Sequence, residues 1–141
     1  MLPPVTGGIV MQEDVGKLVV RLGVGGLLLL HGVHKLLTGI APIKAMVVAA
    51  HLPDLIAYGV YLGEIAGPIL VILGLFSRLG GLLIVANMLA AIALAGMASL
   101  FQLNAFGGYA LELETFFLLG GLSVMLLGAG RLSLNIGGRW N

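Results

Sequence analysis

AYGVYLGEIAGPILVILGLF, residues 57–76, is the stretch that decides the fold. It is apolar and about 20 residues long, which is enough for a helix to cross the hydrocarbon of a bilayer. A single charged residue, Glu64, lies near its middle. A charged side chain at that depth costs roughly 3 kcal/mol on insertion scales, and such residues usually face a bundle interior or a wet cavity. We therefore predict that the rest of the chain packs so as to hide Glu64 from lipid.

The same stretch carries two features that favour close packing around the carboxylate. Gly59, Gly63 and Gly67 recur at every fourth position, so they share one helical face that a neighbouring helix can approach closely. Pro68 has no N–H to donate to the carbonyl of Glu64, four positions back. The backbone is therefore expected to be loosened at the carboxylate itself.

The composition is typical of a membrane protein. Hydrophobic residues make up 60% of the 141 residues and charged residues only 9%, against about a quarter charged in soluble domains. The length fits a single domain, residues 1–141. A net charge of +1 without a basic stripe argues against nucleic-acid binding. The absence of cysteine excludes thiol–disulfide catalysis, thiolate metal sites and iron–sulfur clusters within this chain.

The apolar pattern predicts an all-α integral membrane four-helix bundle. Each predicted span has about 20 residues, or roughly 30 Å of helix, and the spans cover about residues 15–33, 55–76, 79–100 and 110–129. Asp14 is a candidate N-cap for the first span, and residues 1–12 look like an irregular lead-in. Residues 42–51, PIKAMVVAAH, predict a short interfacial helix between the first two spans.

The distribution of positive charges predicts the orientation in the membrane. Four spans place both termini on one side, and the connections around residues 35–54 and 101–109 on the other. The side of the termini carries five basic residues, whereas the other side carries only Lys35 and Lys44. The five are Lys17, Arg21, Arg78, Arg131 and Arg139. Because cytoplasmic loops are enriched in Lys and Arg, we expect both termini in the cytoplasm and the chain in the cell inner membrane.

In this topology the polar side chains near the membrane collect towards the outer face. His31 ends the first span there, and His34 and Lys35 follow at i+3 and i+4 on the same helical face. Asn87 lies near the midplane in the third span. Together these positions predict an outward-opening polar vestibule with Glu64 at its floor.

Two carboxylates open the fourth span on the same outer side. Glu112 and Glu114 are two residues apart, so they point in roughly opposite directions on a helix. Glu114 shares a face with Gly121 and Gly128, which indicates a seam against another helix. We expect Glu114 to be the inward carboxylate, while Glu112 stays open as the alternative.

Each polar position also has a purely structural interpretation. Glu64 could be a protonated acid that is hydrogen-bonded to a neighbour such as Asn87 or Tyr61. Lys35 is better explained as an ordinary interfacial residue that reaches the headgroups than as a catalyst.

The histidines are open to two interpretations. His31 and His34 could be interfacial residues that meet headgroups, or they could serve a proton relay, a quinone head or a metal. A metal site is disfavoured because no recognisable ligand spacing is present. Haem is disfavoured because no histidine lies deep in a span.

Several short motifs occur together in a fixed order. They are R-L-G at 21–23, H-G-x-x-K at 31–35, E-x-x-G-x-x-L-x-x-L-G-L at 64–75 before Arg78, and G-x-G-R-L-S-L at 128–134. The set resembles the DoxX family of small four-helix inner-membrane proteins, over about residues 21–135. That resemblance implies a membrane-associated oxidoreductase component, because the family is named after a likeness to a membrane subunit of a quinone-linked thiosulfate oxidoreductase.

The resemblance carries over Glu64, the pair of His31 and Lys35, and, less directly, Glu114. Relatives with this fold also serve as cargo receptors or assembly chaperones without redox chemistry. One departure is visible: the family often ends in S-L-D, whereas Ser133-Leu134 is followed here by Asn135.

The leading hypothesis is a membrane subunit of a quinone-linked oxidoreductase system, with a quinone head or small substrate bound in the vestibule. Glu64 and His31 are the candidate catalytic, proton-handling residues, and the candidate binding residues are His34, Lys35, Asn87, Glu114 and Tyr61. A redox partner or cofactor is implied, because the chain has no self-sufficient redox motif. The alternatives are a non-catalytic membrane interaction or assembly protein and a small-solute or metal-ion carrier. A homo-oligomer also stays open.

Overall fold

The computed structural model describes residues 6–134 and 138–141. These residues form helices joined by short connections and no β-strand, with one isolated bridge between Leu103 and Tyr109. The all-α class expected from the sequence is therefore confirmed.

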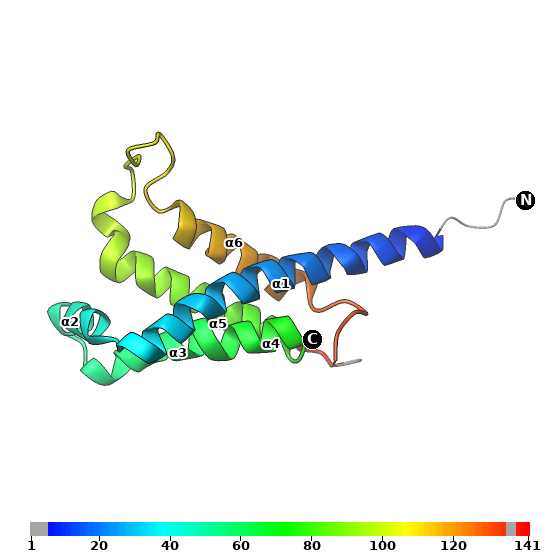
Figure 1. Cartoon of the computed structure of the whole chain (residues 1–141), viewed down its shortest axis with the longest axis horizontal. Helices are drawn as coiled ribbons and strands as arrows, with labels where there is room; N and C mark the ends of the chain where they lie inside the picture. The colour runs from blue at the N-terminus through cyan, green and yellow to red at the C-terminus, as the bar shows by residue number, and fades with distance from the viewer. Residues whose placement is uncertain (1–5, 135–137) are drawn as a thin grey trace, which may run out of the picture.

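The first helix, α1, runs from Thr6 to Thr38. Its 33 residues correspond to about 50 Å, so its N-terminal part projects beyond the other helices (Figure 1). The sequence predicted an irregular lead-in over residues 1–12 and a helix cap at Asp14. Both predictions are wrong for the described residues, because the chain is already helical from Thr6. Residues 1–5 lie outside the described part. Asp14 lies within α1 and is buried, and its Oδ1 accepts a hydrogen bond from the backbone N–H of Arg131 at 3.0 Å.

The middle of the chain folds into two long helical segments that each contain a widened π-turn. The first segment follows the short helix α2 (Ala41–Ala49) and consists of η1 (Asp54–Tyr58), α3 (Gly59–Tyr61), η2 (Leu62–Ala66) and α4 (Gly67–Leu73). The second consists of α5 (Ser77–Ala91), η3 (Ile92–Gly96) and η4 (Met97–Ser99). The turn between them has Gly74 at φ 70° and Phe76 at φ 47°. The last helix is α6 (Glu112–Leu127).

Three helical segments in the described part of the chain are long and apolar enough to cross a membrane: Val10–Thr38, Asp54–Leu73 and Ser77–Ser99. α6 has 16 residues, or about 24 Å, and is shorter than these segments. The fourth crossing and the interfacial position of α2 therefore stay predictions.

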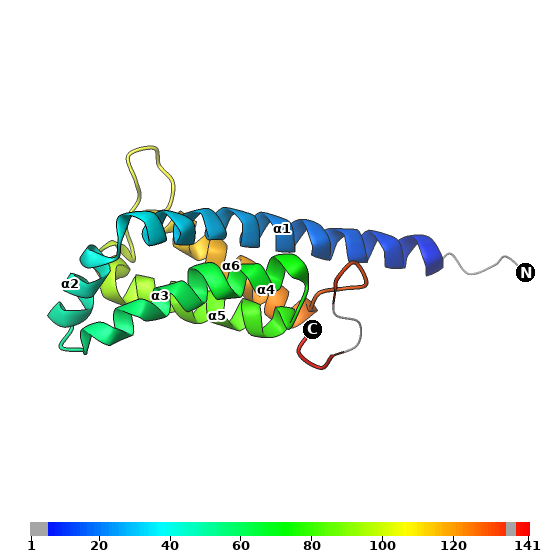
Figure 2. The same cartoon turned by 60° about the horizontal axis from the view of Figure 1, so that its bottom comes forward.

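The helices pack in pairs around one apolar core. α1 contacts α4 and α6, and α5 contacts the same two helices (Figure 2). The core takes residues from all four: Val24, Leu28, Val71, Ile84, Met88, Phe117 and Val124. A smaller cluster, which includes Val47 and Ala57, fixes α2 against η1.

Glycines bring α5 into backbone contact with both of its neighbours. A Cβ on Gly80 would lie 2.8 Å from the carbonyl oxygen of Gly67, and one on Gly81 would lie 2.6 Å from that of Gly121. Gly63 lies directly against the side chain of Asn87, whereas Gly59 has nothing within 4 Å. The predicted glycine seam is therefore a helix contact at Gly63 and Gly67 but not at Gly59.

The two ends of the molecule are built differently. The start of α1 and the end of the chain lie at one end, and α2 and the α5–α6 loop lie at the other (Figures 1 and 2). At the end with the chain termini, the segment after α6 returns to the α4–α5 turn. There the Leu134 N–H donates to Leu73 O, and the Arg78 N–H donates to Trp140 O.

Candidate functional site

The site is organised around a widened turn of helix that holds Glu64. This π-turn, η2, spans Leu62–Ala66 and is followed by Pro68 in the first turn of α4. Because Pro68 has no N–H, the carbonyl of Glu64 lacks the hydrogen-bond donor that residue i+4 normally provides. The helix widens into a π-turn at this point, where the sequence predicts a loosened backbone. Short π-turns of this kind often occur at functional sites.

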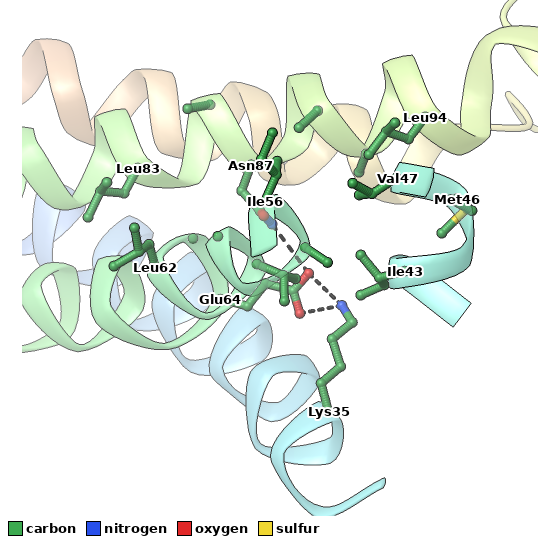
Figure 3. Close-up of a pocket in the computed structure, with 17 residues that line it drawn as sticks. Lys35, Ile43, Met46, Val47, Ile56, Leu62, Glu64, Leu83, Asn87 and Leu94 are labelled. Carbon is green, nitrogen blue, oxygen red and sulfur yellow. Dashed lines mark hydrogen bonds and ion pairs between the residues drawn. The ribbon is translucent and has the colours of Figure 1, made fainter. Parts of the chain in front are cut away.

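Glu64 is hidden from the outside of the molecule, as the sequence predicts. It is 4% exposed, and both of its carboxylate oxygens accept hydrogen bonds from the Lys35 ammonium. The Asn87 side-chain amide donates to Oε1 at 3.3 Å (Figure 3). α1 and α5 thus supply one polar partner each to a carboxylate on the segment between them.

Lys35 does not reach outwards, and the prediction that it serves as an interfacial residue at the headgroups is wrong. The physical reason lies one turn earlier on α1. Gly32 sits directly against the backbone of Glu64, where any Cβ would collide with the carbonyl oxygen. That close approach brings the Lys35 ammonium within reach of the carboxylate, and the opposite charges offset each other's cost of burial.

Tyr61, the other proposed partner of Glu64, bonds elsewhere. Its hydroxyl donates to the carbonyl oxygen of Lys35 at 3.3 Å. It therefore supports the backbone that carries Lys35 and does not contact the carboxylate.

A cavity of about 450 Å³ lies on one side of the ion pair, between α2, the η1–η2 segment and α5 (Figure 3). Its wall is largely apolar, with side chains such as Ile43, Val47 and Leu94. The polar side chains that reach it are Lys35, Glu64 and Asn87. We call it the large cavity.

A second cavity of about 140 Å³, the small cavity, lies on the other side of the pair between α1, α5 and α6. His31 and Glu114 line it together with Lys35 and Glu64. The His31 ring meets the Phe117 ring edge-on, with 5.8 Å between centroids and an interplanar angle of 81°.

The structure separates the remaining candidates clearly. Glu114 is half-buried and lines the small cavity, whereas Glu112 is exposed and lies 3.4 Å from the Asn104 amide. Glu114 is therefore the inward carboxylate of the two. His34 is exposed and lines neither cavity.

Sequence reasoning missed a fully buried arginine on α1. Arg21 is 1% exposed and donates to four carbonyl oxygens at 2.7–2.9 Å, those of Val71, Ile72, Ala129 and Leu132. We counted it only as a positive charge at the cytoplasmic end and as part of a motif. Its position inside an apolar span was the available signal, because ionisable residues there require a partner.

A cluster of metal ligands is not found in the part of the chain that the structure describes. No group of three or more His, Asp or Glu side chains lies close enough there to hold an ion. The groups best placed to bind an organic cofactor are the donors at the large cavity, Lys35 and Asn87.

Comparison with known proteins gives one result. A family model described as DoxX matches residues 16–97, more than half of the chain, and this region includes Lys35, Glu64 and Asn87. Comparison with curated proteins finds no match, and neither does comparison with solved structures.

Proposed function

The chain belongs to the DoxX family, and we propose that it is a membrane subunit of a quinone-linked oxidoreductase system. In this proposal a quinone head, or a substrate of similar size and polarity, binds in the large cavity. Lys35 and Asn87 orient it, and Glu64 exchanges a proton with it.

The large cavity is the observation that carries the proposal. Its volume of about 450 Å³ falls within the range of about 300–1,000 Å³ found for small-molecule sites. Such sites combine an apolar wall with a few convergent polar groups, which is the composition observed here. An apolar ring with polar oxygens at its edge matches both parts of this lining.

The donors at the cavity fit the oxygens of a quinone. The Lys35 ammonium has three N–H donors and the Asn87 amide has two, while a quinone carbonyl can only accept. The Glu64 carboxylate, already next to Lys35, is placed to take or return a proton at such an oxygen. A bound quinone would supply two-electron, two-proton chemistry. The electrons would come from a redox partner protein in the membrane.

The proposal includes a membrane arrangement. α6 forms the fourth crossing, α2 lies at the outer surface, and both termini face the cytoplasm of an inner-membrane protein. Support comes from the basic residues, which are more numerous at the end of the molecule that carries the termini.

Binding of a short-chain quinone to the purified protein in detergent tests the proposal. Lys35→Met should weaken binding at least tenfold, because it removes the charged donor at the cavity. Lys44→Met is the matched control, since Lys44 is on α2 but does not line the cavity. Equal affinity in these two variants, with both folded as judged by gel filtration, would show that the large cavity is not the quinone site.

One observation favours a second function, that of a non-catalytic interaction protein. The α5–α6 loop protrudes from the molecule (Figure 1) and holds Phe101 and Phe106 almost fully exposed. Its tip is fixed by Asn104 Oδ1, which accepts the N–H groups of Phe106 and Gly108 at 3.0 Å each. Loss of co-purifying membrane proteins in Phe106→Ser, together with absence of quinone binding in the wild type, would favour this function over the first.

A further inference from the structure

We propose that the small cavity is a water-filled proton passage, in which Glu114 and His31 connect the Lys35–Glu64 pair with the aqueous phase. This inference rests on the proposed function, because it supplies the route for the protons that a ligand in the large cavity gives up or takes. It divides the work between the two cavities. The large cavity takes the ligand, and the small cavity takes only water and protons.

The ion pair is the partition between the cavities. Lys35, Glu64 and Ala91 line both of them. Glu64 can therefore meet a ligand on one side and water on the other. The remainder of the large cavity's wall is nearly all apolar and offers no acceptor for a proton that leaves Glu64. The small cavity offers two such groups, His31 and Glu114.

The small cavity has room and partners for water. One water takes up about 30 Å³ in the liquid, so about 140 Å³ holds roughly four or five waters. A buried water needs two to four polar partners. α1 supplies His31 and Lys35, η2 supplies Glu64 and α6 supplies Glu114, whereas α5 contributes only Met88 and Ala91.

Glu114 is available as a proton acceptor. Within residues 6–134 and 138–141, no hydrogen bond or ion pair engages its half-buried carboxylate. A carboxylate that loses bulk water without gaining a protein partner is stabilised by ordered water. Glu112, two residues earlier, is exposed and bonded to Asn104, so it does not share this environment.

His31 forms the outer end of the passage. It is exposed while also lining the cavity, and an imidazole can accept a proton at one ring nitrogen and donate one from the other. A proton that leaves Glu64 would pass through water to Glu114 and then through His31 to the outside. In each transfer, one O–H or N–H bond breaks and another forms, so only the proton moves and no oxidant or reductant is required.

Cysteine accessibility tests the water in the cavity without any ligand. The chain has no cysteine, so an introduced thiol is its only one. Met88→Cys places a thiol in the small cavity at a residue that is 4% exposed. Ile84→Cys, one turn earlier on α5, is the matched control in the dry core, where the residue is 0% exposed.

We expect a small cationic thiol reagent to label Met88→Cys at least tenfold faster than Ile84→Cys, because the reactive thiolate forms only in contact with water. Equal, slow labelling of the two would overturn the inference. If Met88→Cys does not fold, Leu28→Cys gives the same test, because Leu28 is 1% exposed and lines the small cavity but not the large one.

A second measurement separates this inference from the proposed function. When bound quinone is reduced chemically, Glu114→Gln should slow proton uptake at least tenfold, because it removes the carboxylate that passes the proton through the small cavity. Glu112→Gln is the matched control and should leave the rate of proton uptake unchanged. Unchanged proton uptake in Glu114→Gln would refute the passage while the quinone site stands. Rapid Met88→Cys labelling without any quinone binding would refute the proposed function while the hydrated cavity stands.

Discussion

Two of the cations on α1, Arg21 and Lys35, have contrasting surroundings. Arg21 and Lys35 are 14 positions apart, or about 21 Å along the helix. Arg21 is enclosed by four backbone carbonyls from two distant parts of the chain. Lys35 meets a carboxylate and borders two cavities. The first holds the fold together, and the second stands where a ligand can reach it.

The difference shows how to interpret a buried charge in a membrane protein. Burial alone does not separate structure from function, because both cations leave the lipid. The two cations differ in the number of donors that are already engaged. Four of the five Arg21 N–H donors are engaged by carbonyls, whereas Lys35 keeps a donor that a ligand oxygen can accept.

Removal of Arg21 should have the largest effect. Arg21→Met leaves four carbonyls without their charged donor, and we expect a loss of more than about 4 kcal/mol of stability, enough to prevent recovery of folded protein. Arg21→Lys should rescue little, because one ammonium cannot reach carbonyls of both α4 and the segment after α6. The measurement is the yield and thermal unfolding of the detergent-solubilised protein. Arg139→Met, at an exposed position, is the control, and a wild-type melting temperature in Arg21→Met would remove the structural role.

Breaking the ion pair should have the next largest effect. Lys35→Met or Glu64→Gln alone leaves a buried group without its partner and should cost roughly 3 kcal/mol. The double variant should lie within about 1 kcal/mol of the wild type, because two neutral groups remain. A double-mutant cycle from thermal or denaturant unfolding measures the coupling. Additive losses would mean that the two charges do not interact as the structure shows.

The contact that brings Lys35 to Glu64 can be tested at Gly32. Gly32→Ala should cost about 1–3 kcal/mol, because its methyl group collides with the Glu64 carbonyl oxygen. Gly26→Ala, on the same helix, meets nothing within 4 Å and should stabilise by about 0.5–1 kcal/mol. Unfolding measurements on both variants decide the sign. Similar effects in the two would contradict the close approach of α1 and η2.

Lys44 on α2 is a cation at the surface, and changes to its surroundings should have the smallest of these effects. Its ammonium donates to the Tyr58 hydroxyl at 2.7 Å and lies 3.9 Å from an Asp54 oxygen. The hydrogen bond to Tyr58 raises the pKa of Lys44 above its ordinary value of 10.5. The resulting stabilisation is therefore present below pH 10.5 and is lost as the pH rises through the raised value.

Tyr58→Phe keeps the ring beneath the ammonium but removes the hydroxyl, so it should lower the pKa of Lys44. NMR titration of the Lys44 side chain measures the shift. An unchanged titration in Tyr58→Phe would show that the hydrogen bond is not formed in solution.

The sequence correctly predicted those features of the structure that depend on a single helix. The helical class follows from apolar runs, the burial of Glu64 follows from its place in such a run, and the loosened turn follows from Pro68. The inward choice of Glu114 over Glu112 also came from one helix face. Each of these properties is local, because a 3.6-residue period or a missing N–H fixes it.

What the sequence did not predict depends on how two distant segments are rotated against each other. Lys35 was placed at the headgroups because nothing near it in the sequence shows that Gly32 will touch Glu64. Arg21 was counted as a cytoplasmic charge because backbone carbonyls leave no signature in a sequence. The same applies to Asp14, whose partner Arg131 lies more than a hundred residues away.

The coordination of Arg21 sets an order of events during synthesis. Arg21 is synthesised before any of its acceptors, and the first of these, on Val71 and Ile72, follow some fifty residues later. Its remaining acceptors, on Ala129 and Leu132, lie over a hundred residues behind it. At roughly 5–20 residues per second, the ribosome takes about 3–12 s to travel from Val71 to Ala129. During that interval only two of the four acceptors of the guanidinium exist, so its coordination is completed only after Ala129 and Leu132 have been synthesised.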